Sequence, residues 1–136
     1  MRILICGDRN WDDQKTMNEV FFQFSKKFGK SVVIIEGEAR GADTMARRLA
    51  ERYGFEVLPF HAEWEKYGLA AGPLRNKRMI NEGKPNLVLA FHNNLSESKG
   101  TKNTITQAEK ADITYTVIRS STNIKVRLTK VFGEIL

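Results

Sequence analysis

Short apolar runs alternate along this chain with longer stretches in which apolar residues recur at three- and four-residue spacing. The apolar runs predict β-strands near residues 2–6, 31–36, 55–60, 86–91 and 113–118. The stretches between them predict helices near residues 14–28, 42–53, 73–82 and 101–112. Strands that alternate with amphipathic helices are typical of an α/β fold, with a parallel sheet of about five strands and helices on both faces.

The end of the chain has a different pattern. After a turn-like break at residues 120–123, Ile124, Val126 and Leu128 alternate with basic or polar residues. This period of two predicts a half-buried strand, either at a sheet edge or in a subunit contact. We therefore expect one domain over residues 1–118, with residues 119–136 as a C-terminal strand extension of the same domain. Because an exposed strand edge pairs readily, the strand favours a homodimer or a higher homo-oligomer.

Composition adds an anionic partner to this picture. The net charge is +6 and the pI is near 9.6, which points to a nucleotide, a phosphate or a nucleic acid. The basic residues are dispersed and form no long basic run, so nucleic acid is not the favoured partner. No apolar run is long enough to span a bilayer and no signal-peptide pattern follows Met1, so we expect a cytoplasmic protein without a membrane partner. The single cysteine, Cys6, fits a reducing compartment.

Residues suited to chemistry collect in four segments that follow predicted strands. The segments are residues 7–9, 36–43, 61–76 and 92–101. Ligands of open α/β sheets bind outside the carboxyl ends of the strands. The four segments therefore predict one crevice at that edge of the sheet.

The segment at residues 36–43 is a glycine-bearing turn between a predicted strand and a predicted helix. Gly37 and Gly41 allow the backbone to approach an anion, and the N–H groups at the helix start point toward it. Arg40 adds a fixed positive charge with several donors. The spacing is neither G-x-G-x-x-G nor a Walker A loop, so a plain strand–helix connection remains the alternative.

Two further helix starts carry groups suited to a phosphate ligand. Arg75 and Asn76 lie in the first turn of a helix predicted to begin near Pro73, where they suit a phosphate and a ribose hydroxyl or base edge. Ser98, Gly100 and Thr101 resemble a small anion nest that opens the next helix. An exposed first turn and a simple helix cap are the respective alternatives.

The aromatic residues Trp64 and Tyr67 lie in a segment without a clear period. They are suited to stacking on a nucleobase, and packing inside the protein is the alternative. His61 is followed by carboxylates, but no second histidine lies at ligand spacing, so we expect no metal. We expect no cofactor either.

Three carboxylates at the second turn are candidates for proton transfer. They are Glu36, Glu38 and Asp43. Pairing with Arg40 or capping of the following helix explains them equally well.

Taken together, these segments resemble the YspA-like (DUF2493) family of the SLOG superfamily, to which the LOG phosphoribohydrolases and the DprA/Smf proteins also belong. The segments are Gly-Asp-Arg at 7–9, the turn at 36–43, Ala-Glu-Trp-Glu-Lys-Tyr-Gly at 62–68, Ala-Ala-Gly-Pro-Leu-Arg-Asn at 70–76 and Ser-Lys-Gly-Thr at 98–101. The resemblance covers about residues 1–118, and residues 62–76 are its most specific part. It implies a Rossmann-like sheet with a crevice for a nucleotide or a nucleotide-derived ligand.

The chain departs from the family pattern at several positions. The second turn of the family usually reads His-Gly-Gly-Ala-Arg-Gly-Ala-Asp, whereas Glu36 and Glu38 stand here at the first and third positions. Asp8 stands where a serine is usual, which favours ribose hydroxyls over phosphate. LOG enzymes carry Gly-Gly-x-Gly-Thr-x-x-Glu with a catalytic glutamate at the end. Alignment on Gly100 and Thr101 puts Thr104 at that position, which implies that the hydrolytic carboxylate of the LOG type is missing.

The favoured function is therefore binding of a nucleotide-derived small molecule, such as a nucleoside phosphate or an ADP-ribose-like compound, for sensing or sequestration. The expected ligand-binding residues are Gly7, Asp8, Arg9, Gly37, Arg40, Gly41, Asp43, Trp64, Arg75, Asn76, Ser98, Gly100 and Thr101. The first alternative is hydrolysis of an N-glycosidic or phosphate bond in such a ligand, with Glu36, Glu38 or Asp43 as the substitute carboxylate. The second alternative is binding of single-stranded nucleic acid in the manner of the DprA proteins.

Overall fold

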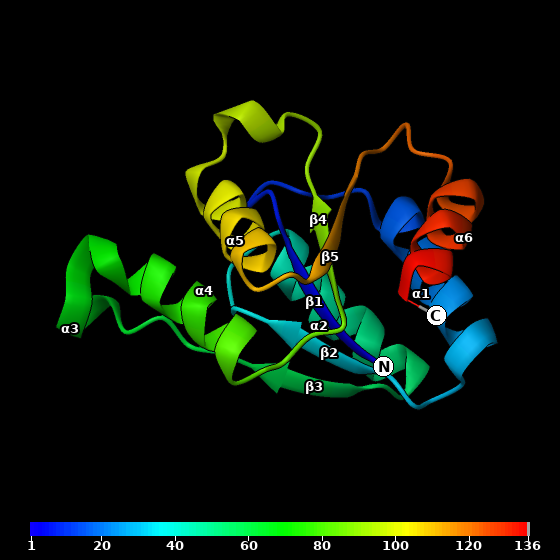
Figure 1. Ribbon diagram of the computed structural model, residues 1–136, viewed down its shortest axis with the longest axis horizontal. Helices are drawn as coiled ribbons and strands as arrows, with labels where there is room; N and C mark the ends of the chain where they lie inside the picture. The colour runs from blue at the N-terminus through cyan, green and yellow to red at the C-terminus, as the bar shows by residue number, and fades with distance from the viewer. Residues whose placement is uncertain (136) are drawn as a thin grey trace.

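A five-stranded parallel sheet forms the centre of the fold (Figure 1). The computed structural model describes the backbone of residues 1–135 and the side chains of residues 1–133. The strands are β1 (Arg2–Gly7), β2 (Val33–Glu36), β3 (Glu56–Pro59), β4 (Leu87–Phe91) and β5 (Thr114–Ile118). Their order is β3-β2-β1-β4-β5, and every neighbouring pair is parallel. The predicted α/β class and its five strands are confirmed.

Helices cover both faces of this sheet (Figure 1). One face carries α1 (Gln14–Phe28), α2 (Ala42–Tyr53) and α6 (Ile124–Ile135), and the other carries α4 (Ala71–Asn81) and α5 (Lys99–Lys110). β1 shows why both faces are covered: Ile3 and Ile5 pack into one core, and Leu4 and Cys6 pack into the other. Since successive strand residues point to opposite faces, a strand buried on both sides is a continuous apolar run. Within the described residues, no helix is long and apolar enough to cross a membrane.

The strand order reverses direction between β1 and β4. From β1 the chain moves to β2 and β3 on one side, and β4 and β5 lie on the other side. The loops that follow β1 and β4 therefore lead to opposite faces of the sheet, which opens a crevice between them. This point of the sheet determines where the candidate site lies.

A short arm precedes α4 and projects from the body of the molecule (Figure 1). It consists of α3 (Trp64–Tyr67) and the 3₁₀ turn η1 (Gly68–Ala70). α4 then begins at Ala71, slightly before the start predicted at Pro73. A second 3₁₀ turn, η2 (Leu95–Glu97), lies in the loop before α5. The Oγ of Ser98 accepts a hydrogen bond of 3.1 Å from the Thr101 N–H, so Ser98 is the N-cap of α5.

The predicted C-terminal strand is wrong, because this segment forms the helix α6. Its buried residues are Ile124, Leu128, Val131 and Phe132, whose spacing follows a helical period, whereas Val126 is 65% exposed. Residues 124–129 are too few to distinguish the two-residue period of a strand from the period of a helix. α6 packs on α1 and β5, and the ring centroids of Phe28 and Phe132 lie 5.4 Å apart. The expectation of a strand extension over residues 119–136 is corrected to a helix at Ile124–Ile135, and Leu136 lies outside the described residues.

Candidate functional site

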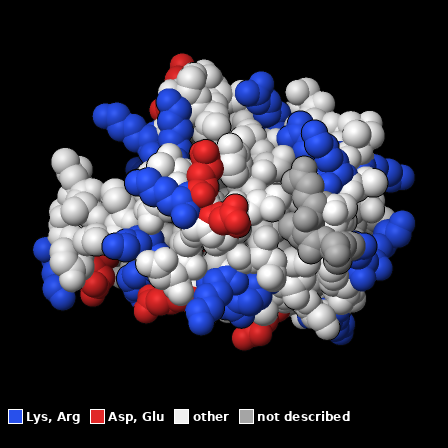
Figure 2. Space-filling model, in the orientation of Figure 1, with Lys and Arg blue, Asp and Glu red and all other residues white. Residues whose placement is uncertain are grey.

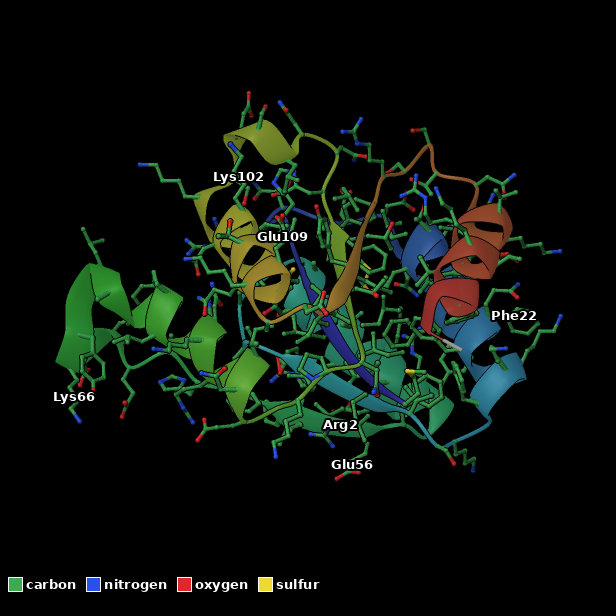
Figure 3. The ribbon with its side chains drawn as sticks, in the orientation of Figure 1. Arg2, Phe22, Glu56, Lys66, Lys102 and Glu109 are labelled. Carbon is green, nitrogen blue, oxygen red and sulfur yellow. The ribbon has the colours of Figure 1, made fainter. Side chains whose placement is uncertain are left out.

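A cavity of about 460 Å³ lies at the carboxyl ends of β1 and β4, where the strand order reverses, and we call it the main cleft because most of the predicted ligand-binding residues line it. Four parts of the chain line it: the loop after β1, the start of α2 with the loop before it, α4, and the region from the end of β4 to α5. Figure 3 shows Lys102, in the first turn of α5, in the upper part of the molecule and Arg2, at the start of β1, in the lower part. The end of β1 and the start of α5 both line the cavity, so the main cleft lies at the edge of the sheet that the sequence predicts.

Two glycines allow the walls of the main cleft to meet. A Cβ on Gly7 would lie 2.2 Å from the Phe91 carbonyl oxygen, so the end of β1 approaches β4 closely. Gly41 has a φ of 77°, and a Cβ there would lie 2.3 Å from the Asp8 carbonyl oxygen. That oxygen accepts a hydrogen bond of 3.1 Å from the Ala42 N–H. Side chains at either position would push the loop after β1 away from β4 or from α2.

Positive charge reaches the main cleft from several segments. Arg9 follows β1, Arg40 precedes α2, Arg75 lies on α4 and Lys99 begins α5, and all four line the cavity. Arg9 and Arg40 are exposed and form no salt bridge within the described part of the chain. The N-terminal turn of α5 adds the partial positive charge of its free N–H groups. The arrangement suits a ligand with phosphate groups.

Arg75 is held in one orientation by the protein itself. Its Nη1 donates a hydrogen bond of 2.6 Å to the Gly37 carbonyl oxygen, and its Nε donates one of 3.0 Å to Asn76 Oδ1. The Asn76 side chain is buried and donates through Nδ2 to Asn103 Oδ1 at 3.1 Å. Asn76 thus joins α4 to α5 and orients Arg75, and its contact with a ribose or base stays a prediction.

Asp43 is a buried carboxylate in the wall of the main cleft. Its Oδ2 accepts hydrogen bonds from the N–H groups of Gly37 at 2.8 Å and Ala39 at 3.4 Å. Burial raises the pKa of Asp43 to about 6, although these bonds and the nearby Arg75 oppose that rise. A carboxyl group with such a pKa exchanges its proton near neutral pH, as a general base does.

The other two candidate carboxylates lie outside the main cleft. Glu36 is fully buried; its Oε1 accepts a hydrogen bond of 2.7 Å from the Glu38 N–H, and its Oε2 has no partner among the described residues. Burial raises the pKa of Glu36 to about 7. The Glu38 carboxylate contacts His61 Nδ1 at 3.1 Å and Arg47 at 4.0 Å, rather than Arg40. Of the three, only Asp43 can touch a ligand in the cleft.

His92 is a cleft residue that the sequence did not single out for ligand binding. The residue is 7% exposed, and its Nδ1 accepts a hydrogen bond of 3.0 Å from the Asn94 N–H. This bond leaves Nε2 as the nitrogen that carries the proton in the neutral ring. Nε2 faces Asp8 Oδ2 at 3.9 Å. The sequence did contain one signal for this residue: His92 follows directly after β4, and ligands bind where the strand order reverses between β1 and β4.

A second hollow of about 350 Å³ adjoins the main cleft. It is lined by Arg9, Gly37, Glu38, Ala39, Arg40, His61, Ala62, Trp64 and Arg75. Tyr67 does not reach it and lines a different depression beside α4. The structure therefore separates the two aromatic residues that the sequence considered together.

Most of the predicted ligand-binding residues meet in the main cleft. These are Gly7, Asp8, Arg9, Arg40, Asp43, Arg75, Asn76, Ser98, Gly100 and Thr101. Gly37 and Trp64 line the second hollow, and Gly41 supports the loop after β1 without lining either cavity. Thr104, at the position of the LOG glutamate, lines the main cleft and is buried.

Comparison with known proteins shows the family of this chain. Residues 1–67 match the sequence model of YAcAr, the YspA, cpYpsA-related SLOG family. This chain belongs to that family. The matched region runs from β1 to α3, so it includes the loops that supply Arg9 and Arg40 to the SLOG cleft. The chain is also 38% identical over 117 residues to the Gene 61 protein of Mycobacterium phage D29, an alignment that covers 82% of this chain and 91% of the phage protein.

Proposed function

We propose that this SLOG-family protein binds a nucleotide-derived small molecule through its phosphate groups in the main cleft, for sensing or sequestration. The convergence of Arg9, Arg40 and Arg75 on one cleft, from three separate segments, carries the proposal. Membership of the SLOG family supports it, since that family is associated with nucleotide-related ligands. Charged hydrogen bonds to phosphate contribute more than neutral ones, so three guanidinium groups favour a multiply charged ligand.

Isothermal titration calorimetry with ADP and with inorganic pyrophosphate tests this proposal. Arg40→Ala and Arg75→Ala should each weaken binding by about 1.5–3 kcal/mol, the range for a hydrogen bond to a charged group. Arg52→Ala is the matched control, because Arg52 lies in the last turn of α2, away from the cleft. Affinities that are unchanged in both cleft variants would contradict the proposal.

Hydrolysis of an N-glycosidic or phosphate bond is the second candidate function. Asp43 favours it, because this carboxylate lines the cleft beside Arg75 and its pKa is raised to about 6. In such a reaction Asp43 would take a proton from water, and Arg75 would stabilise the charge of the leaving phosphate. Thr104 in place of the LOG glutamate favours binding without hydrolysis.

Binding of single-stranded nucleic acid has less support. Figure 2 shows Lys and Arg side chains distributed over the visible face rather than gathered in one continuous patch. A protein that follows a nucleic-acid backbone needs a continuous basic groove.

A further inference from the structure

The main cleft and the second hollow share one wall. Arg9, Ala39, Arg40 and Arg75 line both cavities. Arg75 is fixed in this wall by its hydrogen bonds to the Gly37 carbonyl and to Asn76. We call Arg9, Arg40 and Arg75 the arginine ridge. A ligand that crosses it would meet positive charge in the middle and a cavity on each side.

Trp64 gives the second hollow an aromatic wall. A Cβ on Gly72 would lie 3.3 Å from Cη2 of the indole, so the ring packs on α4 at a position that has no side chain. Even so, Trp64 remains 46% exposed, and it lines the hollow together with the small residues Gly37 and Ala62. A large aromatic ring that is supported on one side and open on another is suited to stacking on a flat ligand.

We propose that the second hollow holds the base of the same ligand, stacked on Trp64, while a diphosphate lies across the arginine ridge. The inference rests on the proposed function and specifies its ligand class: a nucleoside diphosphate that carries a further polar group, such as a sugar, in the main cleft. The cavities, at about 460 and 350 Å³, each fall in the size range of small-molecule sites. Asp8, His92 and the α5 N-terminus in the main cleft offer hydrogen bonds to hydroxyl groups of that further part.

Three probes separate the parts of such a ligand: inorganic pyrophosphate, ADP and ADP-ribose. Trp64→Ala should lower the affinity for ADP and ADP-ribose about tenfold or more, because it removes the stacking surface. Its affinity for pyrophosphate should stay within about twofold of the wild type, and Trp64→Tyr should restore most of the ADP affinity. Tyr67→Ala, which removes an exposed aromatic from the same helix but from outside both cavities, should change none of the three affinities.

Tryptophan fluorescence provides a readout that a purely structural role of Trp64 would not give. The protein has two tryptophans, and Trp11 is only 5% exposed and packs edge-on against Phe91. ADP should therefore quench the wild-type emission, pyrophosphate should not, and the quenching should be absent in Trp64→Tyr.

The outcomes distinguish this inference from the proposed function. Normal ADP affinity in Trp64→Ala, combined with loss in Arg75→Ala, would overturn the base site and leave phosphate binding in place. Equal loss of pyrophosphate and ADP in Trp64→Ala would show that Trp64 only supports the arm, and would also overturn the base site. If the wild-type protein binds none of the three probes, the proposed function itself fails.

Discussion

Arg75 and Gly37 are matched in shape as well as in hydrogen bonding. The Arg75 guanidinium donates to the Gly37 carbonyl at 2.6 Å, and a Cβ on Gly37 would lie 2.9 Å from Arg75 Cδ. The side chain that carries charge into the cleft thus occupies the space where residue 37 would otherwise have its own side chain. This contact links the turn after β2 to α4, and it explains why a small residue suits position 37.

Gly37→Ala should weaken ligand binding without unfolding the protein. The added methyl group displaces the Arg75 side chain, which loses its hydrogen bond and its fixed orientation. We expect the calorimetric affinity for pyrophosphate to fall roughly three- to tenfold, because the site is no longer preorganised. Gly133→Ala is the control, since that position lies on α6 with open space around it. Equal pyrophosphate affinities in wild type and Gly37→Ala would show that Arg75 does not need this support.

The buried carboxylates should make the protein more stable at mildly acidic pH than at mildly alkaline pH. Glu36 has its pKa raised from 4.5 to about 7, and Asp43 from 3.8 to about 6. Between the unfolded and folded pKa values the folded state binds more protons, so the free energy of unfolding falls as pH rises through that window. Each pKa unit corresponds to about 1.4 kcal/mol. The lowered pKa of Asp13 acts in the opposite direction, but only near and below its ordinary value of 3.8.

Thermal denaturation followed by circular dichroism between pH 5 and pH 8 measures this effect. The Tm of the wild type should decrease by several degrees over that range. Glu36→Gln keeps an acceptor for the Glu38 N–H and removes the charge, so its Tm should depend less on pH and be higher than that of the wild type at pH 8. A wild-type Tm that rises steadily from pH 5 to pH 8 would contradict the assignment of raised pKa values.

Incubation with nucleoside monophosphates or with NAD should release neither free base nor phosphate at an enzymatic rate. The reason is that Thr104 cannot supply the carboxylate that a LOG enzyme has at that position. Chromatography of the reaction mixture measures both products. Turnover that is lost in Asp43→Asn and kept in Glu38→Gln would instead establish hydrolysis, with Asp43 as the general base.

Two substitutions on α6 should differ strongly in their effect on stability. Leu128 is 2% exposed in the core against α1, so Leu128→Ala should lower the free energy of unfolding by about 2–5 kcal/mol. Val126 points outward, so Val126→Lys should change it by less than about 0.5 kcal/mol. Urea denaturation measures both values, and equal losses would contradict the helical arrangement.

The homodimer stays a prediction, but the strand from which it was predicted is a helix. The homodimer was expected to cover an apolar strand face at Ile124, Val126 and Leu128. Of these three residues, Ile124 and Leu128 are buried within the protein and Val126 is exposed. Light scattering of Val126→Lys should therefore give the same mass as the wild type; a smaller species would place α6 in a subunit contact.

Local patterns were enough to predict the five strands and most of the longer helices of this fold. The apolar runs are the five strands, and the helical periods of residues 14–28 and 42–53 coincide with α1 and α2. A strand or helix that buries a face must carry the matching apolar period, so this information is present in the sequence itself. The pattern gave the wrong element over residues 124–129, which fit both a strand and a helix period, and the burial of Val131 and Phe132 decides for a helix. It also did not predict the short elements α3, η1 and η2, which have too few residues to show a period.

The order of the strands had to come from the tertiary structure. Parallel strands pair through backbone hydrogen bonds, which carry little information about which strand lies next to which. The order β3-β2-β1-β4-β5 places the loop after β1 beside the end of β4, and so brings Asp8 close to His92. The tertiary packing also buries Glu36 and joins Asn76 of α4 to Asn103 of α5. It places Trp64 and Tyr67 in different cavities. The sequence determined which loops carry the chemistry, whereas the contacts between distant segments decided which of their side chains share a cleft.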